Sequence, residues 1–285
     1  MERLKEILAF VNDKGGVGKT TTVHNLAYGL TRIDSKARVL VIDLDAQAAN
    51  ISLLMGWKEH DHPLQRTMYD CLSQQVSLPA YDIKRMKESY GMPTLKSDSR
   101  IYLAPASTKL LSIDPFLLQQ MNPLKVLCKV FAQDIIVDGE GMSIVEAFDY
   151  VLIDCPPAMN LLTKNAMTVA TGIVVPMQLE ALATFGSSSV IKWAKEIKEE
   201  LNPNLDLRGI LKVMVDKRTS ASKSFSDHID EEYGEYVFKT EIPRRTKIVE
   251  AQAMLQDIFT YKPYDDAGMA YERFAREIVN SVHNS

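Results

Sequence analysis

The 285-residue sequence has few cysteines, no long hydrophobic run and no excess of basic residues. Its three cysteines, Cys71, Cys128 and Cys155, form no CxxC motif, which is typical of a reducing compartment and leaves no spacing suited to an iron–sulfur cluster. No apolar run approaches the roughly 18 residues of a membrane-spanning helix. The charged N-terminus, residues 1–6, leads directly into an apolar segment and does not read as a signal peptide. We therefore expect a cytoplasmic protein.

The net charge is −4, so any binding of nucleic acid would have to come from a local basic patch. Hydrophobic residues make up 46% of the chain and charged residues 25%, which is typical of a globular protein and argues against disorder or a membrane class. No internal repeat, low-complexity tract or linker divides the sequence. We expect one domain over residues 1–285.

Short apolar runs alternate with longer amphipathic segments, a pattern that predicts a parallel sheet with crossover helices. Some runs are almost entirely apolar, as strands buried on both faces are. Strands are expected at residues 6–12, 38–43, 101–105, 150–154, 172–176, 208–215 and 237–241. Helices are expected near residues 20–32, 161–170, 184–201, 220–233 and 266–282. The sequence therefore predicts an α/β fold, with a doubly wound, mostly parallel sheet and helices on both faces.

Two segments do not fit this alternation. Residues 56–100 are polar and contain three scattered prolines, and residues 115–149 include the acidic, glycine-containing stretch Asp138-Gly139-Glu140-Gly141. We expect both to form helices and loops that decorate one end of the sheet.

The most informative motif is NDKGGVGKTT, residues 12–21, between the first expected strand and the first expected helix. Glycines let the backbone approach a phosphate closely, and the N–H groups at a helix N-terminus bind its oxygens. In such a loop, Lys19 reaches the β- and γ-phosphates and the Thr20 hydroxyl binds Mg²⁺. A standard phosphate loop has glycine at position 13, whereas this chain has Asp13 followed by Lys14. The expected ATP-binding residues of the loop are Lys14, Gly15, Gly16, Val17, Gly18, Lys19, Thr20 and Thr21.

Three aspartates follow expected strands at the edge where open α/β sheets bind their ligands. Asp43 and Asp45 end the second strand, and Asp154 ends the strand at 150–154. A single aspartate in such a position is more often a cap or turn residue. Three of them beside a phosphate loop favour a site that binds Mg²⁺ and hydrolyses a nucleotide.

The double-lysine form KGGVGKT resembles the deviant Walker A motif of the ParA/MinD ATPases. Residues 43–47, DLDAQ, resemble switch I of that family, and residues 153–157, IDCPP, resemble its Walker B/switch II motif. The resemblance implies a P-loop fold and Mg²⁺-dependent hydrolysis of ATP to ADP and phosphate. It further implies that Cys155 is a small buried residue and not a nucleophile.

The family resemblance also assigns roles to the charged residues. Asp45 would position or activate the attacking water, and Asp43 and Asp154 would hold Mg²⁺ through water. Lys14 would reach across an ATP-dependent homodimer to the partner's phosphates, so that Lys14, Lys19 and Asp45 form the catalytic set. Adenine recognition is implied, largely through backbone, for Met214, Asp216, Pro243 and Arg244.

The resemblance covers most of the chain, and only residues 56–100 and 115–149 match poorly. There are three departures in otherwise matching motifs, one of which is Ala48-Ala49-Asn50 in place of the usual Gly/Ala-Asn order. Ala46 stands where switch I normally has proline, which bears on the mobility of switch I and on turnover. Arg245 stands where the family normally has asparagine.

The C-terminal segment helps to separate the classes within the family. Residues 270–279 predict a core-docked helix of mixed charge, whereas a membrane-bound MinD ends in a basic amphipathic helix. The phosphate loop begins at residue 12, which leaves no room for the N-terminal helix-turn-helix of the large ParA proteins. The sequence is most similar to the short, Soj-type ParA proteins, which implies a nucleoid-associated ATPase that segregates plasmid or chromosomal DNA with a ParB-like, centromere-binding partner and without a membrane. The alternative is a MinD-like or other positioning ATPase that acts on a protein cargo without DNA binding.

Basic residues after two expected strands support the DNA-binding interpretation. Arg218 and Lys247 match DNA-contacting positions of the family, and Lys223 and Arg245 lie close to them in the sequence. Contacts from such side chains to phosphates give affinity without sequence preference and with a strong salt dependence. Acidic residues at 230–232 lie between the two groups, so solvated loop residues are the simpler alternative.

Overall fold

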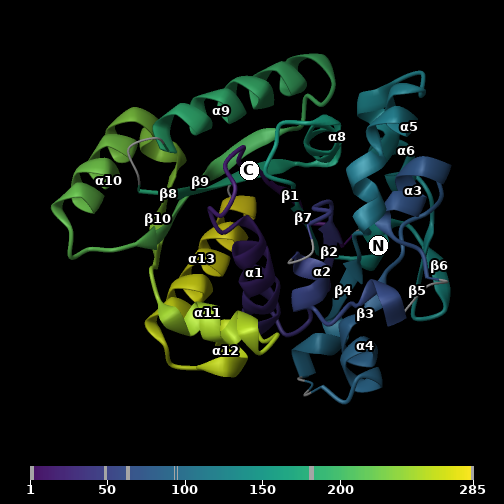
Figure 1. The fold of residues 1–285 in the computed structure, drawn as a ribbon, viewed down its shortest axis with the longest axis horizontal. Helices are drawn as coiled ribbons and strands as arrows, with labels where there is room; N and C mark the ends of the chain where they lie inside the picture. Colours follow the sequence, from purple (N-terminus) through teal and green to yellow (C-terminus); the bar gives the residue numbers. More distant parts are fainter. Residues whose placement is uncertain are drawn as a thin grey trace.

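The computed structural model describes residues 3–47, 50–61, 65–92, 94, 96–179 and 183–283. Eight strands form one sheet in the order β10-β9-β8-β1-β7-β2-β4-β3 (Figure 1). All neighbouring strands are parallel except β3, which runs antiparallel to β4. The strands are β1 (Glu6–Phe10), β2 (Val39–Asp43), β3 (Tyr81–Asp82), β4 (Ile101–Ala104), β7 (Tyr150–Asp154), β8 (Gly172–Gln178), β9 (Asp206–Val215) and β10 (Val237–Pro243). Each strand expected from the sequence is present.

Helices cover both faces of the sheet, which confirms the doubly wound fold. Alternation along β1 sends Leu8 and Phe10 into one hydrophobic core and Ile7 and Ala9 into the other. The first core is covered by α1 (Lys19–Ile33), α2 (Ile51–Leu54), α4 (Ile83–Ser89), α11 (Thr246–Ala253), α12 (Ile258–Tyr261) and α13 (Asp266–His283). The second is covered by α3 (Met68–Gln74), α5 (Asp114–Leu118), α6 (Val126–Phe131), α7 (Ile144–Ala147), α8 (Leu161–Val169), α9 (Ala183–Glu200) and α10 (Ser220–Tyr233).

Residues 56–100 and 115–149 contain the expected helices and loops, and they also contain short strands that the sequence did not predict. Residues 56–100 supply the edge strand β3, and residues 115–149 include a separate hairpin of β5 (Ile135–Val137) and β6 (Glu140–Met142). These strands are two or three residues long, too short for a visible alternation of apolar and polar positions. The hairpin turn is Asp138-Gly139, with φ of 55° and 90°, which is the left-handed backbone that an Asp-Gly hairpin turn requires.

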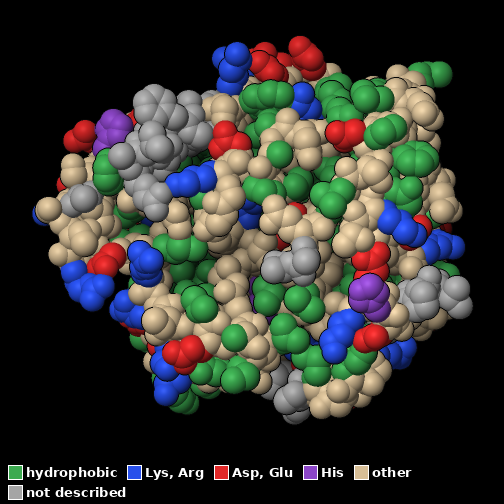
Figure 2. All heavy atoms as spheres, in the orientation of Figure 1, with side chains coloured by type: hydrophobic (Ala, Val, Ile, Leu, Met, Phe, Trp, Pro, Cys, Tyr) green, Lys and Arg blue, Asp and Glu red, His purple; other side chains and the backbone are tan. Residues whose placement is uncertain are grey.

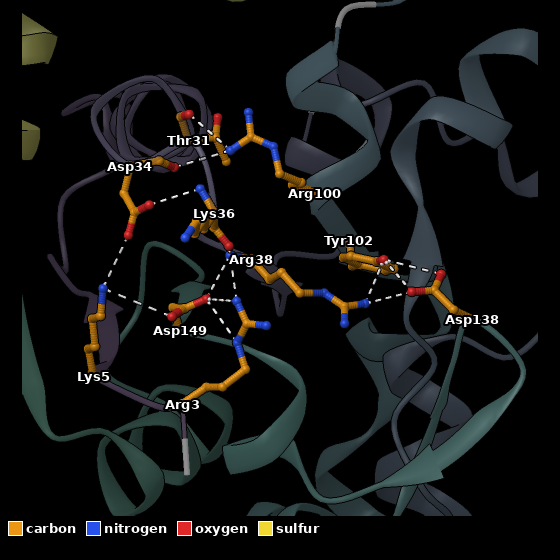
Figure 3. Close-up of polar contacts among 10 residues, drawn as sticks. All are labelled: Arg3, Lys5, Thr31, Asp34, Lys36, Arg38, Arg100, Tyr102, Asp138 and Asp149. Atoms are coloured by element: carbon orange, nitrogen blue, oxygen red, sulfur yellow. Dashed lines mark hydrogen bonds and ion pairs between the residues drawn. The ribbon is translucent and has the colours of Figure 1, made fainter. Parts of the chain in front are cut away.

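The amino-terminal ends of the central strands are held by a polar network (Figure 3). Asp149 accepts hydrogen bonds from the Arg3 side chain, at 2.7 Å, and from the backbone N–H of Arg38, at 2.8 Å. The Arg38 guanidinium donates to Tyr102 Oη at 2.7 Å and to Asp138 Oδ2 at 2.8 Å. The network therefore ties the tip of the β5–β6 hairpin to β2 and β4, at the end of the sheet opposite the phosphate loop.

A buried ion pair, Lys87–Asp98, is attached to α1 through hydrogen bonds to Tyr28. Lys87 Nζ donates to Tyr28 Oη at 2.8 Å and to Asp98 Oδ1 at 3.0 Å, and Tyr28 Oη also donates to Asp98 Oδ1 at 2.8 Å. Lys87 is 5% exposed and Asp98 is fully buried. These hydrogen bonds hold the 56–100 segment against the helix that follows the phosphate loop. Removal of either ion-pair partner would leave a buried charge without its counterion, which is strongly destabilising.

Within the described residues, no helix combines the length and the apolar character needed to cross a bilayer.

Candidate functional site

The loop between β1 and α1 has the backbone that its glycines allow. Gly16 and Gly18 have φ of 75° and 79°, in the left-handed region that side chains with a Cβ disfavour. Gly18 is also the N-cap of α1, so the first free N–H groups of the helix follow it directly. The Asn12 side chain donates to Pro176 O on β8 at 2.8 Å and anchors the start of the loop.

Lys19 is the first residue of α1, and its side chain folds back over the loop. Its ammonium donates to Asn12 O at 3.1 Å and to Lys14 O at 3.2 Å, and the residue is 6% exposed. Burial lowers the pKa of Lys19, and the charges of Asp154 and Asp45 act in the opposite direction. Two loop carbonyls therefore hold the Lys19 ammonium, and the carboxylates of Asp154 and Asp45 lie close enough to favour its charged form. Lys14 lies half-buried at the start of the same loop.

A cavity of about 520 Å³, here called the loop cavity, opens beside this loop. It is lined by the expected residues Gly15, Gly16, Val17, Gly18, Lys19, Thr20, Thr21, Asp45 and Met214. Sequence analysis missed its other lining residues, which are Gln47, Asn50, Leu53, Leu54, Pro157, Val249, Gln252, Ala253 and Leu255. Gln47 and Pro157 belong to the recognised motifs, but the α11 residues are more than 200 positions from the loop and carry no local signal. Gln252 Nε2 donates to Thr21 Oγ1 at 2.8 Å and joins α11 to α1.

Asp154 and Asp43 are direct neighbours in the register of β7 and β2, and both are fully buried. Neither carboxylate oxygen of Asp154 has a hydrogen-bond partner among the described residues. Burial raises the pKa of Asp154 to about 7, although the nearby Thr20 hydroxyl and the Lys19 ammonium oppose the rise. A buried carboxylate without a donor, beside a threonine hydroxyl, fits a hard divalent cation such as Mg²⁺.

Asp43, in contrast, is fully engaged by the protein. Its oxygens accept hydrogen bonds from the backbone N–H of Asp45 at 3.0 Å, from the backbone N–H of Ser52 at 3.0 Å and from the Ser52 hydroxyl. Burial and the neighbouring charge of Asp154 raise the pKa of Asp43. The geometry orients Asp43 through Ser52, a residue that the sequence analysis did not single out.

Asp45 lies at the wall of the loop cavity and is 9% exposed. One oxygen accepts the backbone N–H of Gln47 at 3.0 Å, and burial raises the pKa of the carboxyl. In the described part of the chain, no three His, Cys, Asp or Glu side chains converge as a metal-binding group. A cation held here would take most of its ligands from phosphate and water oxygens, as Mg²⁺ commonly does.

A second cavity of about 320 Å³, the strand-end cavity, adjoins the loop cavity at the ends of β9 and β10. Of the four residues expected to recognise adenine, Met214, Pro243 and Arg244 line it and Asp216 does not. Asp216 instead binds Arg218. Met214 lines both cavities and has φ of 53°, an uncommon conformation for a side chain of its size. Backbone strain of this kind clusters at ligand sites.

The basic residues expected to contact DNA follow β9 and β10, but three of them are paired with carboxylates. Arg218 donates to both oxygens of Asp216, at 2.8 and 2.6 Å, and Lys247 Nζ lies 2.7 Å from Glu250 Oε2. Arg245 pairs with Asp266 and also lines the strand-end cavity. Lys223 is exposed on α10. Figure 2 shows blue and red side chains interspersed on the left, over α10 and α11, and no uniform basic surface.

Cys155 is fully buried, and burial raises the pKa of its thiol. This agrees with its interpretation as a packing residue.

A phosphate loop between β1 and α1, with carboxylates at the ends of the neighbouring strands, defines the P-loop class of nucleotide-binding proteins. Residues 5–207 match the family model described as an AAA domain. The chain is 31% identical over 274 residues to the chromosome partitioning protein ParA of Caulobacter vibrioides, which covers 96% of this chain and 94% of the relative. It is 29% identical over 274 residues to the sporulation initiation inhibitor protein Soj of Bacillus subtilis, and the match covers 96% of this chain and 98% of Soj.

Two solved structures are similar in fold to this chain over almost its whole length. Cobyrinic acid a,c-diamide synthase from Mycobacterium smegmatis, with bound ATP analog and magnesium, is 28% identical and superposes with a TM-score of 0.73 over 96% of this chain and 94% of that one. The cell division ATPase MinD of Pyrococcus furiosus, 22% identical, shares the fold with a TM-score of 0.70 over 97% and 99% of the two chains. This protein belongs to the ParA/MinD family of P-loop ATPases.

Proposed function

We propose that the protein is a partition ATPase of the ParA type, which hydrolyses ATP with Mg²⁺ and binds DNA as an ATP-dependent dimer. The observation that carries the catalytic part is that Lys19 and Asp45 line the loop cavity, with the unpartnered, buried Asp154 carboxylate close enough to act on the charge of Lys19. The ATP analog and magnesium in the Mycobacterium smegmatis relative support the same ligands here.

The residues divide the chemistry among them. The ammonium of Lys19 stabilises the negative charge that develops on the β- and γ-phosphates. Asp45, at the cavity wall, positions the attacking water. Mg²⁺ would be held by the Thr20 hydroxyl and, through water, by Asp154 and Asp43, and it would supply positive charge against the phosphates. Lys14 completes the site of the opposite subunit in the dimer. The strand-end cavity, with Met214, Pro243 and Arg244, receives the adenine.

We further propose that ATP controls DNA binding by controlling dimerisation, and that a ParB-like partner stimulates hydrolysis on plasmid or chromosomal cargo at the nucleoid. The ParA and Soj names of the relatives support this choice. A dimer presents two copies of each basic residue after β9 and β10, which enlarges a patch that is modest in one subunit. Phosphate contacts from Arg218, Lys223, Arg245 and Lys247 need no base recognition.

The ion pairs of Arg218, Arg245 and Lys247 favour a second candidate. A side chain already paired with a carboxylate offers less charge to a phosphate, and the surface around it is mixed. A positioning ATPase that acts on a protein cargo would keep the nucleotide site and lack DNA binding.

A DNA mobility-shift assay with ATP, with ADP and without nucleotide separates the two. We expect binding with ATP only, similar affinity for unrelated sequences and a steep loss with salt. The double variant Arg218→Glu/Lys247→Glu should weaken binding by at least about tenfold and leave basal hydrolysis near normal. The charge-matched control Lys58→Glu/Lys84→Glu, at residues outside the segments that follow β9 and β10, should bind like the wild type. Absence of binding by the wild-type protein with ATP at low salt would favour the protein-cargo ATPase.

A further inference from the structure

The largest cavity described here is lined mainly by residues of the segments 56–100 and 115–149, together with Tyr102 of β4. This edge cavity has a volume of about 670 Å³, within the range of roughly 300–1,000 Å³ that is usual for ligand pockets. It lies between β3, α4 and the tip of the β5–β6 hairpin, on the right in Figure 1. None of its lining residues lines the loop cavity or the strand-end cavity.

One wall of the edge cavity is an edge of the main sheet. β3 pairs with β4 on one side and is the last strand of the sheet on the other. The residues that lead into β3, Ser77 to Ala80, line the same wall. An edge of this kind presents backbone N–H and C=O groups that an extended peptide can pair with.

Two arginines and two aspartates line the cavity, and one positive charge is left in excess because one of the aspartates, Asp138, pairs with Arg38 outside the lining. Arg66 and Arg85 both line it and are exposed, and neither forms an ion pair with another described residue. Asp138, on the opposite wall, is already engaged by the Arg38 guanidinium and the Tyr102 hydroxyl (Figure 3). Asp82 caps α4 and accepts the backbone N–H of Arg85 at 3.1 Å. Two guanidinium groups are therefore available to an incoming carboxylate.

Part of the remaining lining is apolar. Leu78 and Met86 form buried parts of the wall, at 3% and 7% exposure. Ile136, on the β5–β6 hairpin, also lines the cavity and is 72% exposed. An apolar side chain of a ligand can lie between them.

We propose that the edge cavity binds an extended peptide segment with acidic side chains, whose backbone adds to β3, whose carboxylates pair with Arg66 and Arg85, and whose alternate side chains pack toward Leu78 and Ile136. This interaction is separate from the nucleotide site, and its location leaves the carboxyl-terminal edge of the sheet accessible. The cavity thus provides this chain with a docking site for a protein partner at the β3 end of the sheet, formed mainly by residues 56–100 and 115–149.

The test uses the full chain without nucleotide and a fluorescein-labelled probe peptide, acetyl-Gly-Glu-Val-Glu-Val-Glu-Gly, followed by fluorescence anisotropy. We expect saturable binding that weakens by at least about tenfold in Arg66→Ala/Arg85→Ala and with the matching glutamine peptide. Lys84→Ala, one residue from Arg85 but not in the cavity lining, is the matched control and should bind like the wild type. In an amide NMR spectrum, the peptide should shift signals of residues 77–82 and leave the other sheet edge, residues 237–243, unchanged.

Three results would overturn the proposal: no binding of the probe to the wild type, equal binding of the glutamate and glutamine peptides, or unchanged affinity in the double arginine variant. Displacement by free glutamate as effective as by the peptide would identify a small-anion site instead. Because the assay contains no nucleotide, Lys19→Ala should bind the probe like the wild type. The result is therefore independent of the proposed ATPase function.

Discussion

At the scale of single residues, Lys19 is the most constrained charge in the molecule's loop cavity. Two loop carbonyls position its ammonium, so little reorganisation separates this geometry from one that contacts phosphate. Lys19→Ala should abolish nucleotide binding or turnover, because charge stabilisation dominates phosphoryl transfer. ATPase assays with titration of a fluorescent ATP analogue measure both effects. Hydrolysis at the wild-type rate would show that the phosphate-loop assignment is wrong.

A substitution of Asp45 should separate ATP binding from ATP hydrolysis. Asp45→Ala removes a carboxylate at the cavity wall and leaves the phosphate loop and Asp154 in place. We expect ATP binding and dimerisation to persist, as measured by light scattering, while hydrolysis falls on the order of 10²-fold or more. If ATP binding is lost instead, Asp45 is a structural or metal-binding residue, and Asp43 becomes the better catalytic candidate.

Ser52 holds Asp43 with both its backbone N–H and its hydroxyl, and its hydroxyl also accepts the N–H of Ala106 at 3.0 Å. Ser52→Ala should lower the free energy of unfolding by about 1–3 kcal/mol, because a buried carboxylate and a buried N–H each lose a partner. It should also raise the Mg²⁺ concentration needed for half-maximal ATPase activity, since Asp43 would be less well oriented. Ser52→Thr keeps the hydroxyl and should restore both values. Unchanged Mg²⁺ dependence in Ser52→Ala would assign Ser52 to stability alone.

At the scale of elements, α1 carries a buried histidine that makes stability depend on pH. Burial lowers the pKa of His24 to about 3, and the positive charge of Lys87 adds to the effect, compared with 6.5 for an unperturbed histidine. In the unfolded chain His24 therefore binds a proton below about pH 6.5, whereas in the folded chain it does so only below about pH 3. Stability from this residue is complete above pH 6.5 and is lost as the pH falls.

We expect the wild type to lose about 2 kcal/mol of unfolding free energy through His24 between about pH 7.5 and about pH 5. Urea unfolding at the two pH values, for the wild type and for His24→Leu, measures this loss. The comparison uses only the change with pH, so a packing defect in the variant cancels. An identical pH dependence in both proteins would contradict the prediction.

The elements also show where the sequence was informative. Runs such as Val39–Ile42 lie in the buried centre of the sheet, where burial on both faces leaves a visible apolar pattern. β3, β5 and β6 are too short for a pattern, and their positions depend on contacts with distant segments. The Asp138-Gly139 turn was a local hairpin signal that the sequence analysis assigned to a loop.

At the scale of the whole molecule, the candidate site was predictable where its residues belong to contiguous motifs. The phosphate loop and the aspartates at the ends of β2 and β7 come together because parallel strands place their carboxyl ends at one edge. Ser52 and the α11 residues could not be assigned in this way, because their roles arise from packing and long-range hydrogen bonds. The ion pairs of Arg218 and Lys247 were equally invisible, although their carboxylate partners lie within three residues.

The position of α11 has a consequence for regulation. This helix contributes Val249 and Gln252 to the walls of both cavities, Gln252 is hydrogen-bonded to Thr21, and Lys247 lies in its first turn. A displacement of α11 by a bound nucleotide would therefore move Lys247 within the same subunit, before any second copy is involved. Such coupling is reciprocal: if ATP raises the affinity for DNA through this helix, DNA must raise the affinity for ATP by the same factor. The eight-residue helix α11 would then couple ATP binding and DNA binding in both directions.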